Sequence, residues 1–274
     1  MIIALLVAGG TVIALLFGTA VLHLIPRLGA FGRGLTDRLC RAPGLDLLIT
    51  YFTVLPMIVG AVAGWRSGEP GGAWWGLAGG IAGQVGTVLL WSILHSLAHA
   101  EARRGPRIIK VLNRIVGPWR NHAALWVTAV VVPLFWAVRL AELFLYPFLV
   151  WLVRFPRYVQ GEWVNVSRQK FDGLVGHDLI WCLYCDWMTG VWSLGSEMLR
   201  NVEAFWCPIR FRSDKKCANC SVDFPDVMTH WIDARGTMDE VTALLEQQYG
   251  NDAPNAWFGH PARLTVEGRA VDPA

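Results

Sequence analysis

The chain has 274 residues, of which 54% are hydrophobic and 16% are charged, and its mean hydropathy is +0.40. Soluble domains carry nearer about 25% charged residues, so this composition excludes an ordinary soluble protein. Residues 1–153 carry 12 Lys/Arg and 5 Asp/Glu, whereas residues 154–274 carry 12 and 16. The first part is typical of a lipid-embedded segment with basic flanks, and the second of a mildly acidic, water-facing domain.

The first two apolar runs predict transmembrane helices. Met1–Ile25 is uncharged, and its length is sufficient to cross a hydrocarbon core of about 30 Å at about 1.5 Å per residue. It lacks the basic start of a signal peptide, so we expect a retained span. Leu45–Trp65 is the second predicted span, in which Pro56 should produce a kink.

The third predicted span, Ala73–Ala100, is rich in glycine. Gly72, Gly76 and Gly80 recur at every fourth position, a spacing that places them on one helical face. Small residues on one face allow helix backbones to approach closely, which favours a central place in the bundle. The competing interpretation is that glycine is simply common in membrane helices.

A fourth apolar run, Ala123–Val153, contains Arg139 and Glu142. The run is too long for one perpendicular span and short for two. We expect one crossing that continues as an interfacial or protruding helix and ends near Phe155 and Pro156. Because Arg139 and Glu142 are three residues apart, they should share a helical face and form an ion pair.

Loop charges predict the topology. Pro26–Gly44 carries four Lys/Arg, Arg66–Gly72 one and Glu101–Asn121 six, so the first and third loops should be cytoplasmic. With four crossings, the C-terminal domain would then be external, although reduced thiols are more stable in the cytosol. We therefore predict a multi-pass protein of the cell (inner) membrane and leave the side of this domain open. Because topology explains the basic loops, no nucleic-acid partner is expected.

Within the third loop, Ile108–Val116 separates apolar and basic positions onto two helical faces. Such a helix should lie in the membrane interface beside anionic lipid. Binding of a cytosolic partner helix is the alternative.

Four histidines are predicted near the same membrane face. His95 and His99 are one helical turn apart, and imidazoles at this spacing can bind a metal ion or provide a haem ligand. The competing interpretation is that these side chains form hydrogen bonds at the headgroup level. The candidate cofactor-binding residues are His23, His95, His99 and His122.

The water-facing domain should occupy residues 154–250, followed by an irregular tail at 251–274. We expect a short strand at Trp163–Val166, a helix beginning at an N-cap Asp178, and a second amphipathic helix at Ser196–Trp206. Thr237 and Glu240 form a predicted capping box that opens the last helix, which should extend to Tyr249.

Five of the six cysteines lie in this domain. Two C-x-x-C pairs favour metal ligation over a disulfide framework, although disulfides and buried core thiols are alternatives. Structural zinc is the default expectation, and an iron–sulfur cluster is the runner-up. The candidate ligands are Cys182, Cys185, Cys207, Cys217 and Cys220, with His177 and His230 as nitrogen alternatives.

These patterns predict a mainly α protein: a polytopic membrane helix bundle of about four spans, followed by a small Cys-rich, metal-stapled α or α+β domain. No catalytic motif is recognised. The leading hypothesis is a structural or assembly subunit that associates with other membrane protein subunits or with itself. The alternatives are an electron-transfer subunit with an iron–sulfur cluster and possibly haem, and a membrane metalloenzyme that uses His95 and His99.

Overall fold

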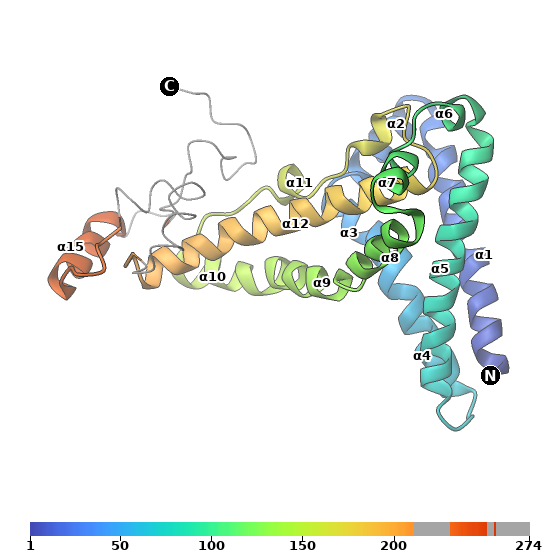
Figure 1. The fold of residues 1–274 in the computed structure, drawn as a ribbon. Coiled ribbons are helices and arrows are strands. Elements are labelled where there is room, and N and C mark those ends of the chain that lie inside the picture. Colours follow the sequence, from blue (N-terminus) through green and yellow to red (C-terminus); the bar gives the residue numbers. More distant parts are fainter. Residues whose placement is uncertain (211–230, 251–254, 256–274) are drawn as a thin grey trace. The chain divides into compact units, whose positions relative to one another are not determined.

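The structure, a computed structural model, describes residues 1–210, 231–250 and 255. The described part of the chain is mainly helical and contains no β-strand (Figure 1). It divides into two compact units, which we describe separately. Unit 1 comprises residues 1–130 and 164–188, and unit 2 comprises residues 131–163 and 189–274.

Among the described residues, four helical segments are long and apolar enough to cross a membrane, as predicted. They comprise Ile2–Arg27, Gly44–Arg66, Gly72–Ala98 and Pro118–Val153. Large apolar side chains such as Leu5, Ile13 and Phe17 project from the first segment and are about 70% exposed. A bilayer would cover these side chains, so the fold is compatible with a multi-pass membrane protein.

Unit 1 is built on three apolar helices, α1 (Ile2–Leu24), α4 (Leu55–Arg66) and α5 (Gly72–Ala98), which lie side by side (Figure 1). Their contact confirms the prediction from glycine spacing. A Cβ atom added to Gly76 would collide with the backbone carbonyl of Gly60 on α4. One at Gly79 would collide with the carbonyl of Ala4 on α1. The helix α5 is therefore the central element of this bundle.

The helix is irregular at the predicted kink, because a short π-helix lies just before Pro56. Here α3 (Gly44–Ile49) continues into η2 (Thr50–Val54) and then into α4. Proline has no N–H, so the carbonyl of Phe52, four residues earlier, loses its helical donor. The Gln84 amide of α5 donates to this carbonyl at 3.0 Å and also to that of Thr53. A polar side chain from a neighbouring helix thus satisfies the broken helix inside an apolar bundle.

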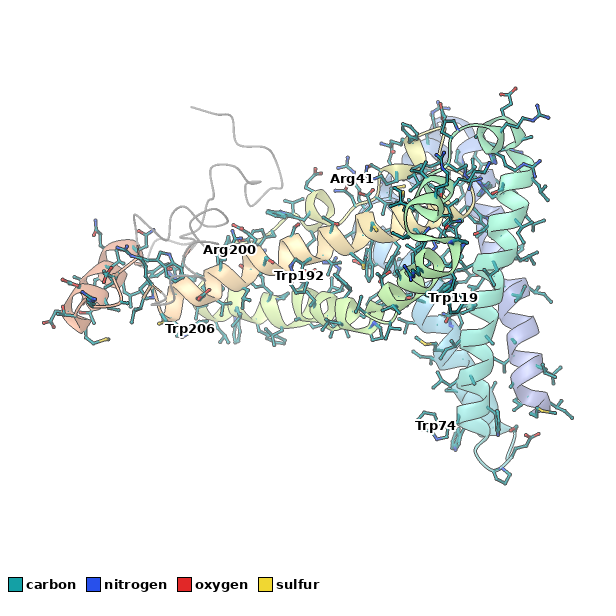
Figure 2. The ribbon with its side chains drawn as sticks, viewed as in Figure 1. Arg41, Trp74, Trp119, Trp192, Arg200 and Trp206 are labelled. Carbon is teal, nitrogen blue, oxygen red and sulfur yellow. The ribbon has the colours of Figure 1, made fainter. Side chains whose placement is uncertain are left out.

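Three short helices lie between the spans at one end of unit 1: α2 (Gly29–Leu39), α6 (Ala100–Arg104) and α7 (Ile108–Val116). The first span ends in η1 (Ile25–Arg27), and the fourth begins with α8 (Pro118–Ala129). The η4 turn is Arg168–Lys170. Trp119, at the start of α8, is 80% exposed (Figure 2). The amphipathic helix predicted at Ile108–Val116 is confirmed.

The strand predicted at Trp163–Val166 is wrong. Its first residue ends helix α11 (Gln160–Trp163), and Asn165 forms only an isolated bridge with Arg41. Two backbone hydrogen bonds flank that bridge, from Ala42 to Val164 and from Val166 to Cys40. The pairing partner is a turn before α3, so the ladder is too short to become a strand.

The two helices predicted after residue 177 are one continuous helix, α12 (His177–Trp206). Gly190 and Gly195 lie inside it and do not end it. Asp178 lies in its first turn and is not an N-cap, because its carboxylate instead binds α7. Trp192 and Trp206 project from α12 and are each 55% exposed (Figure 2).

In unit 2, the fourth apolar run continues as α9 (Val132–Leu140), the π-helix η3 (Ala141–Leu145) and α10 (Tyr146–Val153). A turn at Val130 and Val131 separates α9 from α8. Pro133 follows this turn, and its missing N–H disfavours an uninterrupted helix through it. The run is therefore a broken helix.

The predicted pair of Arg139 and Glu142 is confirmed and fully buried. Arg139 Nη1 donates to Glu142 Oε2 at 2.6 Å, and the two side chains are 0% and 2% exposed. Arg139 also donates to Gln160 Oε1 at 2.8 Å. On α12, Glu197 and Arg200 form a second buried pair at 3.4 Å. The described part of unit 2 therefore contains two buried ion pairs of the same three-residue spacing.

The last predicted helix is also confirmed. Thr237 and Glu240 form the expected capping box at the start of α15 (Met238–Gln248). The tail predicted at 251–274 lies outside the described residues except for Asn255, whose side chain donates to the carbonyl of Val153 at 2.8 Å.

Candidate functional site: a histidine-lined groove

Three of the four candidate histidines line one groove in unit 1. The groove has a volume of about 450 Å³ and lies between the ends of α1 and α5. We call it the histidine groove. It is lined by Leu16, Thr19, Ala20, His23, Leu24, Arg27, Trp91, Leu94, His95, Ala98 and His99. This volume lies within the usual range for small-molecule sites, about 300–1,000 Å³.

The aromatic rings of the groove form a connected set around His95. The His95 and His99 rings are stacked with centroids 4.2 Å apart. The His23 ring meets His95 edge-on at 5.6 Å, and Trp91 lies 4.4 Å from it. His95 is half-buried, whereas His23 and His99 are exposed. The site therefore has one partly enclosed imidazole between two accessible ones.

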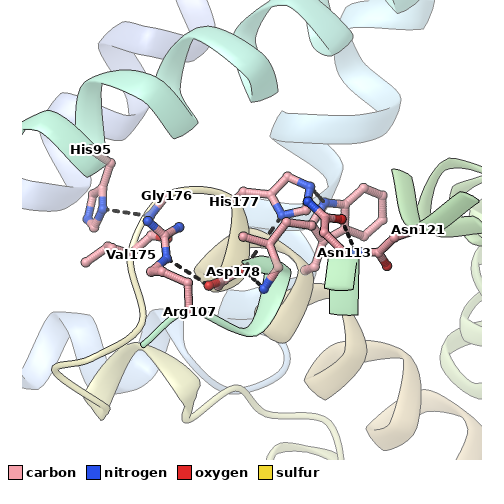
Figure 3. Close-up of polar contacts among 10 residues, drawn as sticks. His95, Arg107, Asn113, Asn121, Val175, Gly176, His177 and Asp178 are labelled. Atoms are coloured by element: carbon pink, nitrogen blue, oxygen red, sulfur yellow. Dashed lines mark hydrogen bonds and ion pairs between the residues drawn. The ribbon is translucent and has the colours of Figure 1, made fainter. Parts of the chain in front are cut away.

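The hydrogen bond at His95 determines which of its nitrogens carries the proton. The backbone N–H of Gly176 donates to His95 Nδ1 at 3.1 Å (Figure 3). Because a backbone N–H can only donate, Nδ1 is the acceptor and a neutral His95 carries its hydrogen on Nε2. His95 is then a hydrogen-bond donor through Nε2.

Gly176 can reach His95 because it has no side chain. Its φ is +55°, and a Cβ atom there would collide with the Ser96 hydroxyl and the Ser92 carbonyl of α5. Only glycine combines this backbone conformation with such a close approach. The tautomer of His95 thus depends on a residue 81 positions away.

His23 and His99 have the opposite tautomer. His23 Nδ1 lies 3.0 Å from the Thr19 carbonyl oxygen, and His99 Nδ1 lies 3.0 Å from the His95 carbonyl oxygen. A carbonyl oxygen only accepts, so each Nδ1 carries the hydrogen and each Nε2 has a lone pair. A histidine that binds haem iron or a metal ion through Nε2 has this tautomer. The groove therefore combines one N–H donor with two imidazole acceptors.

No group of three His, Cys, Asp or Glu side chains in the described part of the chain is arranged to hold a metal ion. In the histidine groove, a neutral His95 that accepts the Gly176 hydrogen bond at Nδ1 has no lone pair on Nε2 with which to bind a metal ion. Binding of haem iron or a metal ion by His23 and His99 stays a prediction.

The fourth candidate, His122, is not part of the groove. Its ring lies 5.2 Å from that of His177, the residue proposed as an alternative metal ligand. Trp181 Nε1 donates to His177 Nε2 at 3.0 Å, so the lone pair of this nitrogen is already used. The topology prediction placed all four histidines near one membrane face, but it could not say which of them are in contact.

An ion pair that the sequence analysis missed lies beside the groove. Arg107 Nε donates to Asp178 Oδ2 at 2.9 Å, and the two side chains are only 8% and 4% exposed. Arg107 also donates to the Val175 carbonyl at 2.9 Å, next to Gly176 (Figure 3). The same contact orders the α6–α7 connection and the turn that reaches His95.

The Asp178 carboxylate also accepts the backbone N–H of Ile109 at 3.2 Å, in the first turn of α7. Burial favours the neutral carboxyl, but hydrogen bonds from His177, Arg107 and Ile109 outweigh burial and lower the pKa of Asp178 below its usual value. Asp178 is therefore a carboxylate at neutral pH. No local sequence signal predicts this contact, because its partners are about 70 positions apart.

The described cysteines, Cys40, Cys182, Cys185 and Cys207, are free thiols. Cys182 and Cys185 lie in the first three turns of α12, and Cys207 directly follows this helix. Burial raises the pKa of the Cys182 thiol, and the nearby Cys185 and Asp178 raise it further. Cys217, Cys220 and His230 lie outside the described residues, so the predicted metal site stays a prediction.

Comparison with protein-family models, with curated proteins and with solved structures found no match to this chain.

Proposed function

We propose that this protein is a membrane subunit that binds a lipid-soluble quinone, or an amphiphile of similar chemistry, in the histidine groove. The observation that carries the proposal is the Gly176 hydrogen bond, which leaves the Nε2–H of His95 as a donor beside two imidazole acceptors. A quinone carbonyl accepts such a hydrogen bond, and the hydroxyl of a quinol can donate to His23 or His99.

The remaining lining fits the rest of such a molecule. Leu16, Ala20, Leu24 and Leu94 provide an apolar wall, and Leu24 and Leu94 are 54% and 48% exposed. A chain-bearing ligand could therefore enter directly from the bilayer. Trp91 adds an aromatic face for a flat ring. This function belongs to the electron-transfer alternative, with electrons supplied by a redox centre of a partner subunit.

Replacement of His95 by phenylalanine should weaken binding of a short-chain ubiquinone analogue about tenfold, the value of one hydrogen bond of about 1.4 kcal/mol. Phenylalanine keeps a flat ring but removes the donor. Binding can be measured by titration of the detergent-solubilised protein with the analogue, followed through tryptophan fluorescence. His95→Gln retains an amide donor and should bind more tightly than His95→Phe.

His122→Phe is the matched control, because it removes a histidine outside the groove. Equal loss of binding in both phenylalanine variants, or no saturable binding by the native chain, would show that the groove is not a quinone site. A Soret absorption band lost on replacement of His23 or His99 would instead identify a haem site.

For the cysteine-rich region, we propose a structural zinc site that holds a small segment together and supports assembly with other membrane subunits. It is favoured by Cys182 and Cys185, two free thiols three residues apart on one face of α12. This proposal is compatible with the first. We also propose that the protein lies in the cell (inner) membrane and leave the side of the cysteine-rich domain open.

Metal analysis of the purified chain tests this second proposal. We expect about one zinc ion per chain and its loss in the Cys217→Ser/Cys220→Ser variant, because thiolates are the expected ligands. Cys40→Ser should retain the metal, since Cys40 instead accepts a hydrogen bond from Gln169 at 3.1 Å. Unchanged zinc in the double variant would contradict the site, and a brown absorption shoulder would favour the iron–sulfur alternative.

A further inference from the structure

The helix α7 exposes a complete apolar face. This face has five side chains, and each of them is at least 38% exposed, so the bundle does not cover it. The face comprises Ile108, Val111, Leu112, Ile115 and Val116. Lys110 and Arg114 lie on the opposite side of the helix and are also exposed. We call these seven residues the α7 surface.

The orientation of α7 is fixed by contacts on the side of the helix that is neither the apolar face nor the basic side. At its start, Asp178 accepts the N–H of Ile109 and pairs with Arg107. Farther along, the Asn121 amide of α8 donates to Asn113 Oδ1 at 2.9 Å. Ile109 and Asn113 thus face the rest of unit 1, which leaves the apolar face directed away from it.

The two candidate spans that flank α7 would place this helix at the surface of a membrane. The candidate span Gly72–Ala98 precedes it and the candidate span Pro118–Val153 follows it. Between them lie five basic residues and one acidic residue, Glu101. In the described part of the chain, Lys110 and Arg114 have no ion-pair partner, whereas Arg107 is paired with Asp178.

We propose that the α7 surface is a binding site for acidic phospholipids. The apolar face inserts at the boundary between headgroups and acyl chains, and Lys110 and Arg114 extend along the helix to contact anionic headgroups. A water-soluble protein partner could cover this apolar face only by entering the boundary between headgroups and acyl chains, where lipid is already present. The combination of apolar face, free cations and flanking spans therefore fits a lipid leaflet better than a partner helix.

The proposal can be tested with the full-length chain in phosphatidylcholine vesicles that contain a trace of spin-labelled lipid. Electron paramagnetic resonance gives the relative association of spin-labelled phosphatidylglycerol and phosphatidylcholine with the protein. We expect a preference for phosphatidylglycerol that falls in the Lys110→Gln/Arg114→Gln variant, by up to about fivefold for each charge removed. High salt should reduce the preference of the native chain in the same direction.

Arg103→Gln/Arg104→Gln is the matched control, because it removes two exposed charges from α6, a helix without an apolar face. This variant should retain most of the preference. An unchanged preference in the α7 variant, or an equal loss in both variants, would overturn the proposal, since binding would then not depend on the α7 surface.

Discussion

Replacement of Arg139 by leucine is expected to lower the free energy of unfolding by about 3 to 5 kcal/mol. The guanidinium lies 2.6 Å from the Glu142 carboxylate, and both side chains are almost completely buried. The variant leaves that carboxylate in an apolar environment without the adjacent cation. Unfolding can be followed by titration of the detergent-solubilised protein with sodium dodecyl sulfate, with circular dichroism as the signal.

A double variant separates the cost of an isolated charge from the value of the pair. Arg139→Leu/Glu142→Leu removes both charges and should recover most of the lost stability, since buried ion pairs are often no better than apolar residues of similar volume. Recovery should be incomplete, because the Oε1 atom of Gln160 also loses the hydrogen bond that Arg139 donates to it. A double variant as unstable as Arg139→Leu would show that unpaired charge is not the cause.

Replacement of Gly76 by alanine should destabilise the α4–α5 contact by about 1 to 3 kcal/mol, and by more if the helices separate. The added methyl group would meet the Gly60 carbonyl, a backbone atom that cannot move unless the helices shift. The same sodium dodecyl sulfate titration measures this loss. The expected result is a transition at lower detergent fraction than that of the native chain.

Gly86→Ala is the matched control in the same helix. A Cβ atom at Gly86 would lie 3.6 Å from Val12 Cγ2, an ordinary van der Waals distance. Alanine is also the better helix former by up to about 1 kcal/mol, so this variant should be neutral or slightly more stable. If Gly76→Ala were as stable as Gly86→Ala, close packing against the Gly60 carbonyl would not be the reason for glycine at position 76.

The sequence was sufficient where a structural feature depends on neighbours within one or two turns of the chain. Apolar length predicted the spans, and the four-residue glycine spacing predicted the packing face of α5. The Arg139–Glu142 pair and the capping box at Thr237 and Glu240 also follow from short spacing. Each depends on helical periodicity, which can be read directly from residue order.

Predictions failed where a distant segment satisfies a local group. Asp178 is of a residue type that is favoured at N-caps, but its carboxylate binds Arg107 and the backbone N–H of Ile109 instead. The residues Trp163–Val166 have strand propensity, yet the segment opposite them offers only a bridge. Local propensities are weak compared with such tertiary contacts.

The histidine groove shows the same division between local and long-range information. Residue order alone predicted that His95 and His99 lie one turn apart and that His23 lies near the same membrane face; in the structure His99 directly follows the last residue of α5. Only the tertiary structure brought these three rings together, placed His122 beside His177 instead, and assigned the proton of His95. The physical reason is that the tautomer depends on the backbone N–H of Gly176, which is 81 positions from His95 in the chain and meets it only in the folded structure, next to the contact between Arg107 and the Val175 carbonyl.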